Sequence, residues 1–343
     1  MLARTLICLT ALLPFSFMGT VPESFAAEAD KTLIVYTARN SKADIAVIEE
    51  IAKEAGIAVE IVSGKAGELV AKLEAGETAD IFITVDGGVL ETAKQKGVLQ
   101  PIENKEILAN VPANLRDKEN AWVGLSTRAR AIVYSKERVK PGQLSTYEDL
   151  TDPKWQGKLL MRPGSAQYNV SLMASLIALD GEDSAAAWAR GVAANFARPA
   201  EGNDRDQAKA IAAGTGDVTL MNTYYLGRML HSGDEGEKQA AEAVGVFFPN
   251  QESTGTHINI CGIALVKGAP NRDAAEKLIA RLTAVPAQEK LAAGNYEYPV
   301  NPGAALPELL AAWGPFKAQA LDFAVLGQNA AKAKELLKAG GWE

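Results

Sequence analysis

The order of short apolar runs and helical patterns in the first third of the chain restricts its fold most strongly. Three β-like runs lie at residues 33–36, 58–62 and 79–85. The segments between them carry apolar residues spaced as on one face of a helix. Residues 79–85 are nearly continuously apolar, which is typical of a strand covered on both faces. This β-α-β-α-β order, with short turns, predicts a parallel, doubly wound α/β sheet.

The rest of the chain predicts a second α/β layer. Residues 124–134 read as one long strand that contains Arg128 and Arg130. Because arginine is rarely buried without a partner, at least one of the two guanidinium groups should face a carboxylate, an anion or solvent. Two long extended stretches, near residues 125–134 and 245–265, are what a chain needs to cross between two lobes and return. We also expect a capped helix over residues 144–155 and two final helices that end at Trp342.

The first residues have the pattern of a secretory signal peptide. Arg4 precedes an apolar stretch at residues 6–17, and small residues at positions 24 and 26 predict cleavage after Ala26. We therefore expect a soluble, exported mature protein without a membrane anchor. Cys261 would be its only cysteine, which excludes an intrachain disulfide. The net charge of −7 argues against nucleic acid and anionic membranes as partners.

Loops at the carboxyl ends of the predicted strands are the expected ligand-binding positions of such a sheet. These loops cover residues 37–41, 63–67 and 86–88. The loop at 63–67 lacks the glycine spacing of a phosphate-binding loop, which excludes a nucleotide site of that type. Asp86 ends a strand on this side, so it is a candidate for contact with a metal or water, or for a role in the turn itself.

Tyr224 and Tyr225 follow a buried-strand pattern at residues 217–221 and open a helical pattern. Adjacent side chains diverge in a strand, but at a strand-to-helix turn two phenols can converge on one point. One interpretation is a pair of tyrosinates that holds a hard, highly charged cation; the other is an aromatic pair packed into a core. Tyr168 opens another helix after a similar loop. Arg228, one turn after Tyr225, is either a partner of a phenolate or a charge on the helix face.

Several segments, taken in order, resemble the periplasmic ferric-ion-binding proteins of ABC-type iron uptake systems. The resemblance extends from about Leu33 to Trp342 and is carried by residues 35–39, 63–69, 125–130, 167–169, 222–228 and 294–300.

The resemblance implies a two-lobed periplasmic-binding-protein fold of type II, the Venus flytrap fold, with two crossover strands at the hinge. The expected N-terminal lobe comprises residues 27–125 plus 252–302. The expected C-terminal lobe comprises residues 126–251 plus 303–343, and residues 1–26 are the signal peptide.

The same resemblance implies that ferric iron is held in the cleft between the lobes by the phenolates of Tyr168, Tyr224 and Tyr225. Many relatives carry a His-Tyr pair directly after the arginine of the first loop, where this chain has Asn40 and Ser41. We therefore expect a synergistic anion, carbonate or bicarbonate, to complete the coordination. The expected anion-binding residues are Arg39, Arg128, Ser126 and Thr127. Further candidates for cleft-facing or supporting positions are Asn40, Arg228 and Asp86.

The function that follows is capture of Fe³⁺ in the periplasm and delivery to an inner-membrane ABC permease by a monomeric, non-catalytic protein. The alternative is a receptor of the same fold for another small solute, such as a polyamine, thiamine or a phosphorylated compound. An exported enzyme is a third class. The sequence shows no Ser/His/Asp arrangement and no paired carboxylates in the expected loops, which argues against it.

Overall fold

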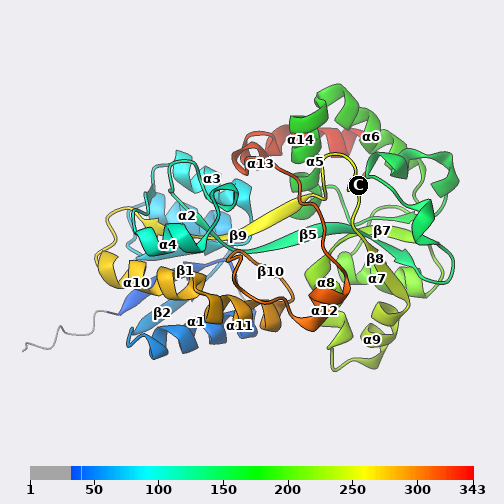
Figure 1. Ribbon diagram of the computed structural model, residues 1–343. Helices are drawn as coiled ribbons and strands as arrows, with labels where there is room; N and C mark the ends of the chain where they lie inside the picture. The colour runs from blue at the N-terminus through cyan, green and yellow to red at the C-terminus, as the bar shows by residue number, and fades with distance from the viewer. Residues whose placement is uncertain (1–31, 40) are drawn as a thin grey trace, which may run out of the picture. The chain divides into compact units, whose positions relative to one another are not determined.

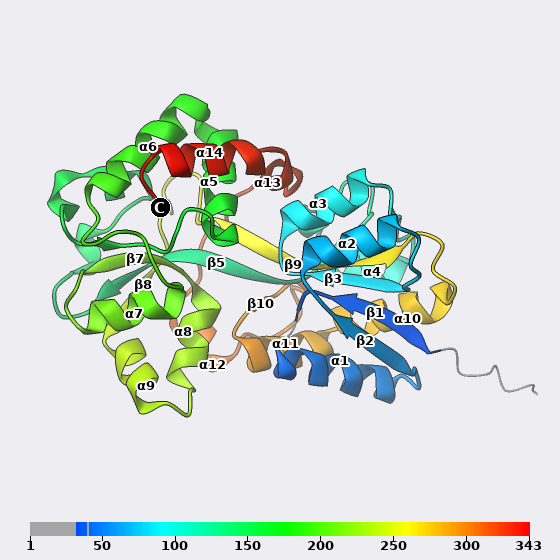
Figure 2. The ribbon, with the colours of Figure 1, turned by 180° about the vertical axis from the view of Figure 1, so that it is seen from behind.

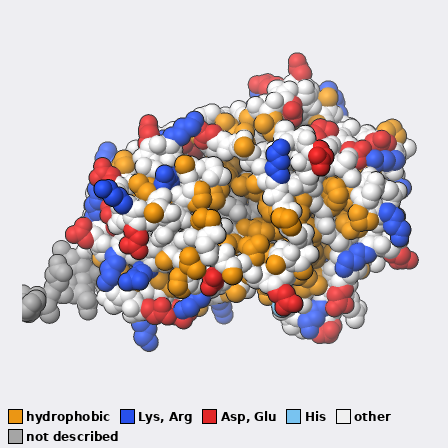
Figure 3. All heavy atoms as spheres, viewed as in Figure 1, with side chains coloured by type: hydrophobic (Ala, Val, Ile, Leu, Met, Phe, Trp, Pro, Cys, Tyr) orange, Lys and Arg blue, Asp and Glu red, His pale blue; other side chains and the backbone are white. Residues whose placement is uncertain are grey.

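A ten-stranded mixed sheet organises the residues that the computed structural model describes, 32–39 and 41–343 (Figure 1). The expected signal peptide, residues 1–26, and Asn40 lie outside the described residues. No helix within the described part of the chain is both long enough and apolar enough to cross a membrane. On the face seen in Figure 1, charged side chains lie mostly toward the periphery and hydrophobic ones gather across the middle (Figure 3).

The strands follow one another in the sheet in the order β2-β1-β3-β9-β5-β7-β6, with β4 beside β9, and β8 and β10 beside β5. Their bounds are β1 Leu33–Thr37, β2 Val59–Ser63, β3 Ile81–Thr84, β4 Leu99–Gln100, β5 Val123–Ser135, β6 Leu159–Leu160, β7 Val218–Asn222, β8 Val244–Phe247, β9 Ile258–Val266 and β10 Tyr298–Pro299.

Helices cover both faces of each half of the sheet (Figure 2). In the first half, α2 and α3 lie on one face and α1, α10 and α11 on the other. In the second half, α5, α6 and α14 lie on one face and α7, α8 and α9 on the other. The helix bounds are α1 Lys42–Glu54, α2 Ala66–Glu74, α3 Gly87–Gln95, α4 Lys105–Asn110, α5 Gln167–Asp180, α6 Glu182–Ala194, α7 Asp204–Ala212, α8 Thr223–Leu230, α9 Glu235–Glu242, α10 Arg272–Thr283, α11 Val285–Asn295, α12 Glu308–Ala312, α13 Ala324–Gln328 and α14 Ala330–Ala339.

The predicted β-α-β-α-β stretch forms the first half of the sheet. β1 pairs in parallel with both β2 and β3, and all four residues of β3 are buried, as expected for a strand covered on both faces. Ile48 and Ile51 of α1 pack with Ile81 and Ile83 of β3 in one apolar core. The sheet is mixed, because β9 runs antiparallel beside β3.

The long strand β5 belongs to both halves of the sheet. Its residues up to Ala129 pair with β9, and its residues from Arg130 onward pair with β7 and β8. This is the crossover strand that the sequence predicts, and β9 is the second one. The exact lobe boundaries that the sequence analysis gives remain a prediction.

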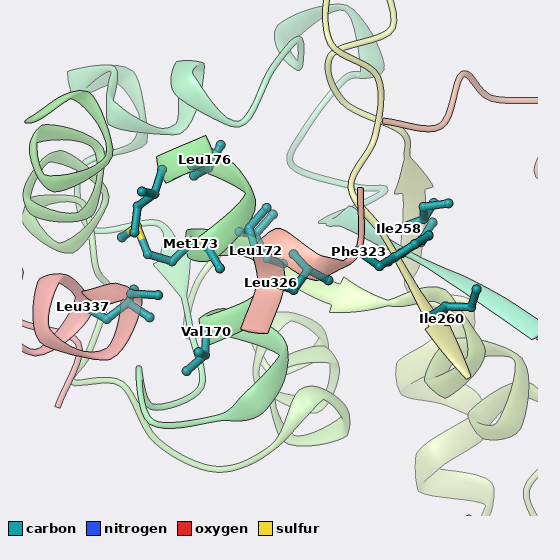
Figure 4. Packing of buried hydrophobic residues seen from close by; sticks show 14 of the residues in the cluster. Val170, Leu172, Met173, Leu176, Ile258, Ile260, Phe323, Leu326 and Leu337 are labelled. Atoms are coloured by element: carbon teal, nitrogen blue, oxygen red, sulfur yellow. The ribbon is translucent and has the colours of Figure 1, made fainter. Parts of the chain in front are cut away.

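Helix α13 joins the two halves on the side opposite α8. Leu326 lies against Leu172 of α5, while Phe323, at the start of α13, lies beside Ile258 and Ile260 of β9 (Figure 4). The neighbouring helix α3 approaches closely enough that its glycines face this segment directly. The C-terminal segment therefore shares apolar contacts with both halves.

Two expectations about local structure were wrong. Residues 144–155 form no α-helix but 3₁₀ turns, η3 Glu148–Thr151 and η4 Pro153–Trp155, preceded by η2 Pro141–Gln143. Proline cannot donate a backbone hydrogen bond inside a helix, and Tyr147 is committed elsewhere: its backbone N–H donates to Asn250 and its hydroxyl to the Arg130 carbonyl. The end of the chain forms three short helices, α12 to α14, rather than two.

Candidate functional site

Three tyrosines lie at the starts of two helices that cover the second half of the sheet. β7 runs directly into α8, which places Tyr224 and Tyr225 in the first turn of that helix. Tyr168 is the second residue of α5. The free N–H groups of a helix start favour negative charge. The sequence predicted this strand-to-helix position for the pair. Asn222 is the residue before α8, and its side chain makes no capping bond to the helix start.

The three phenols converge. The Tyr224 hydroxyl donates a hydrogen bond to the Tyr168 hydroxyl at 2.9 Å. The rings of Tyr224 and Tyr225 lie 4.2 Å apart between centroids, and those of Tyr168 and Tyr225 lie 6.4 Å apart. Tyr224 is buried, while the other two are half-buried. Their oxygens therefore come from two helices to one region of space.

These tyrosines form one wall of a cavity of about 190 Å³. Arg128 and Arg228 belong to the same wall. The opposite wall comes from the loop after β1, the start of α1, the end of β3 and the segment before β10. The residues of that wall are Ala38, Arg39, Ser41, Asp44, Val85 and Glu297.

Arg128 lies in this cavity as a buried cation. Its side chain is only 1% exposed, and none of its three guanidinium nitrogens has a hydrogen-bond partner among the described residues. Its guanidinium carbon lies 5.8 Å from the centre of the Tyr168 ring. Burial alone lowers the pKa of Arg128, but Glu297 and the phenol oxygens together raise it above its ordinary value. A charged donor with unused N–H groups is suited to bind an anion.

Arg39, by contrast, is paired with carboxylates. It makes ion pairs with Asp44 at 2.8 Å and with Glu297 at 2.9 Å, and it donates to the Ser126 hydroxyl at 2.9 Å. Ser126 in turn donates to Glu297. Two of the residues expected to hold an anion, Arg39 and Ser126, therefore bind protein carboxylates in this structure.

Thr127 does not line the cavity. Successive side chains of a strand point to opposite faces, so Thr127 lies on the face opposite Ser126 and Arg128. Its strand partner there is Ile260, which belongs to the apolar core that includes Phe323. Sequence proximity to Arg128 suggested a shared role, but the strand's alternation separates the two side chains.

The supporting candidates have different places. Arg228 lines the cavity, lies 5.0 Å from the centre of the Tyr224 ring and donates to Asn295 at 2.9 Å. Asp86 lies away from the cavity: it caps α3 and accepts hydrogen bonds from Ser171 and Asn259. This is the turn role that was the alternative interpretation of Asp86. Asn40 lies outside the described residues.

Burial raises the pKa of Tyr168, and it raises that of Tyr224 well above the ordinary value. The phenols of Tyr168 and Tyr225 raise the pKa of Tyr224 further, because a negative charge on one phenol disfavours a second charge nearby. In the absence of a cation, Tyr168 and Tyr224 are therefore protonated at neutral pH. A cation bound among the phenols would instead favour their deprotonated, negatively charged form.

Sequence reasoning missed Glu297 and Asp44, which line the cavity and bind Arg39. The signal for Asp44 was present: Ser41 three residues before it is a helix-capping pattern, and the Ser41 hydroxyl does accept from the Asp44 N–H. Glu297 lay inside the resembling segment 294–300, but its partner Arg39 is 258 positions away. No local pattern connects two residues so far apart.

Comparison with known proteins agrees with the fold. Residues 76–324 match the family described as bacterial extracellular solute-binding protein. The chain belongs to this family. Members are substrate-binding components, so a cavity lined by convergent polar groups is the expected binding site of such a protein.

Two solute-binding relatives from Synechocystis sp. resemble the chain over nearly its whole length. Iron uptake protein A1 is 45% identical over 96% of this chain and 93% of its own length. Iron uptake protein A2 is 40% identical over 98% of this chain and 95% of its own length.

Solved structures of the same type superimpose on the chain. A Trichodesmium protein in complex with iron and citrate matches with a TM-score of 0.87 and 42% identity, covering 91% of this chain and all of its own. The ferric binding protein from Campylobacter jejuni matches with a TM-score of 0.84 and 36% identity, over 91% of this chain and 100% of that one. The two-lobed periplasmic-binding-protein fold expected from the sequence is thereby confirmed.

Proposed function

We propose that this solute-binding protein captures Fe³⁺ through the phenolates of Tyr168, Tyr224 and Tyr225. The observation that carries the proposal is the convergence of these three phenols, from two helix starts, on one cavity. The cavity also holds Arg128, whose guanidinium has no hydrogen-bond partner among the described residues. The names of the Synechocystis iron uptake proteins and of the Campylobacter ferric binding protein support iron as the solute.

The chemistry of the donors suits ferric iron. Fe³⁺ is a small, hard cation, and hard cations prefer oxygen ligands. Among the described residues there is no cluster of three or more His, Cys, Asp or Glu side chains that could hold a metal. The three phenols supply oxygen donors of the kind that Fe³⁺ prefers. Binding the metal would drive off the phenol protons that burial otherwise retains.

The charges around the cavity leave room for one small anion. Three arginines and two carboxylates line it, Arg39, Arg128 and Arg228 against Asp44 and Glu297, which leaves one positive charge. Three phenolates balance the three charges of Fe³⁺. A bicarbonate-like anion at Arg128 would neutralise the remainder and supply the metal with further oxygens. The Trichodesmium protein, solved with iron and citrate, supports an oxyanion beside the metal.

The protein would deliver the bound iron to an ABC permease in the inner membrane, acting as a monomeric receptor in the periplasm rather than as an enzyme. Membership of the extracellular solute-binding family supports this role, as does the resemblance to a periplasmic Fe(3+)-binding protein of Serratia marcescens, 25% identical over 92% of each chain. A cavity with three arginines is a poor site for a polyamine or thiamine, since both solutes are cations.

The test is a titration of the purified, metal-free protein with Fe³⁺, with and without bicarbonate, followed by visible absorption. We expect a phenolate-to-iron charge-transfer band, which gives a red or orange protein, and tighter binding when bicarbonate is present. A colourless protein whose iron affinity is unchanged by Tyr224→Phe and Tyr225→Phe would overturn the proposal. Equal affinity with and without bicarbonate would remove the anion alone.

A further inference from the structure

The wall opposite the tyrosines also contains oxygen atoms, but most of them are already engaged. The Ser41 hydroxyl accepts from the Asp44 N–H at 3.1 Å and donates to Asp44 Oδ2 at 2.7 Å. Asp44 Oδ1 accepts from Arg39 at 2.8 Å and from Asn295. Both oxygens of Asp44 and that of Ser41 thus serve the start of α1 and its contact with Arg39.

Glu297 differs, because only one of its oxygens is engaged. Oε2 accepts from Arg39 at 2.9 Å and from Ser126. Oε1 receives no hydrogen bond from the described residues, and the side chain lines the cavity. Two donors at Oε2 hold the carboxylate in one orientation, in a side chain that lines the cavity.

A carboxylate held in this way resembles a metal ligand with its supporting shell. Ligating carboxylates are commonly hydrogen-bonded through their other oxygen, which orients the donor and tunes its basicity. We propose that Glu297 Oε1 is the protein's oxygen ligand to the metal from the wall opposite the tyrosines. This inference rests on the proposed function, and it assigns to Glu297 the position that Asn40 and Ser41 leave open. Arg39 and Ser126 then act as positioning residues for Glu297 rather than as anion ligands.

The competing account is that Glu297 merely neutralises Arg39. The two accounts differ in whether Glu297 is bonded to the metal. Asp44 provides a matched control, because it pairs with the same guanidinium but both of its oxygens are already hydrogen-bonded. We would compare Glu297→Gln, Glu297→Asp and Asp44→Asn in the full-length mature protein. The readouts are Fe³⁺ affinity and the wavelength of the charge-transfer band.

If Glu297 is a ligand, Glu297→Gln replaces an anionic donor by a neutral one, which makes the iron a stronger electron acceptor. The band should then move to longer wavelength, and affinity should fall by about tenfold or more. Glu297→Asp keeps the charge but withdraws the oxygen by one methylene, so it should also move the band. Asp44→Asn should leave the wavelength unchanged. An unchanged wavelength in both Glu297 variants, or an equal shift in Asp44→Asn, overturns the inference.

A crystal structure of the iron-loaded wild-type protein decides the matter even if the Glu297 variants do not fold. An Fe–Oε1 distance of about 2 Å supports coordination, and a distance well beyond that overturns it. The experiments distinguish failure of the proposed iron site from failure of the proposed Glu297 ligand. A wild-type protein without a charge-transfer band removes the iron site as a whole, whereas a coloured wild type whose band ignores Glu297 removes only this ligand.

Discussion

The hydroxyl of Tyr224 donates a hydrogen bond to the hydroxyl of Tyr168 across 2.9 Å, which joins the first turn of α8 to that of α5. One of these oxygens therefore already approaches the other as closely as two ligands of a single cation would. Four of the following predictions concern this cavity or its surroundings, and one concerns the stability of the metal-free protein.

Replacing a single cavity tyrosine by phenylalanine removes one oxygen and preserves the ring. For Tyr168→Phe or Tyr224→Phe we expect Fe³⁺ affinity to fall by about a hundredfold or more, since the loss of residues that only support a metal ligand already costs about ten- to a hundredfold. Competition with a chelator of known affinity measures the change. Tyr36→Phe is the control, because the Tyr36 hydroxyl bonds Glu77 away from the cavity and its loss should leave affinity intact.

Iron affinity should fall as the pH falls. The pKa values of Tyr168 and Tyr224 are raised, so both phenols hold their protons at neutral pH and must release them to the solvent when the metal binds. Each proton released weakens binding by about tenfold for every unit of pH lowered, or up to about a hundredfold for these two phenols. Titrations between about pH 6 and about pH 8, with proton release followed by an indicator dye, measure the slope. A flat profile would contradict phenolate ligation.

Arg128 should determine the response to bicarbonate. Arg128→Met removes a guanidinium that has no hydrogen-bond partner among residues 32–39 and 41–343. We therefore expect bicarbonate no longer to strengthen iron binding, a loss of about tenfold to a hundredfold for one charged, bidentate contact. Arg128→Lys should recover only part of this effect, since an ammonium group cannot bind an oxyanion through two parallel bonds. Arg272, a half-buried residue that is paired with Glu276 and does not line the cavity, gives the control variant Arg272→Met. Full retention of the bicarbonate effect in Arg128→Met would place the anion elsewhere.

His257 should make the metal-free protein less stable in acid. Burial lowers the pKa of His257 to about 4 from an ordinary 6.5, so between these values the unfolded chain binds a proton that the folded chain does not. The resulting stability is present above about pH 6.5 and is lost as the pH falls toward 4, by up to about 3 kcal/mol. Urea unfolding of the wild type and of His257→Gln at several pH values measures this. If the free energies of unfolding of the wild type and of His257→Gln depend on pH in the same way between these two values, His257 does not cause the loss of stability in acid.

Gly227 should resist substitution because α8 packs there against Tyr296. A Cβ atom at Gly227 would lie 2.4 Å from Tyr296 Cγ, so Gly227→Ala must displace the helix that carries Tyr224 and Tyr225. We expect the free energy of unfolding to fall by about 1–3 kcal/mol and iron affinity to fall with it. Gly294→Ala is the matched control in α11, since its Cβ meets nothing within 4 Å; it should be neutral or stabilising. Equal behaviour of the two variants would exclude the packing explanation.

The parts of this molecule that could be predicted from the sequence are those encoded within a few residues. The first strands, the long strand β5 and the helix starts at Tyr168 and Tyr224 all follow from local patterns of apolar and turn residues. The arrangement around Arg39 could not be predicted, because its partners come from the start of α1 and from a segment near the end of the chain. The 144–155 segment was misread for the same reason, since hydrogen bonds from Tyr147 to Asn250 and Arg130 replace those of a helix.

The ion pair between Arg39 and Glu297 also determines at what stage of chain synthesis the cavity can form. A growing chain that has reached Tyr225 already contains every tyrosine of the cavity, but it lacks Glu297 and Asn295, which meet Arg39 and Asp44. Strand β9, which lies between β3 and β5 in the sheet, is also still missing at that stage. The cavity can therefore close only after most of the polypeptide has been made, so a truncated or incompletely translated product would have phenols but no assembled receptor.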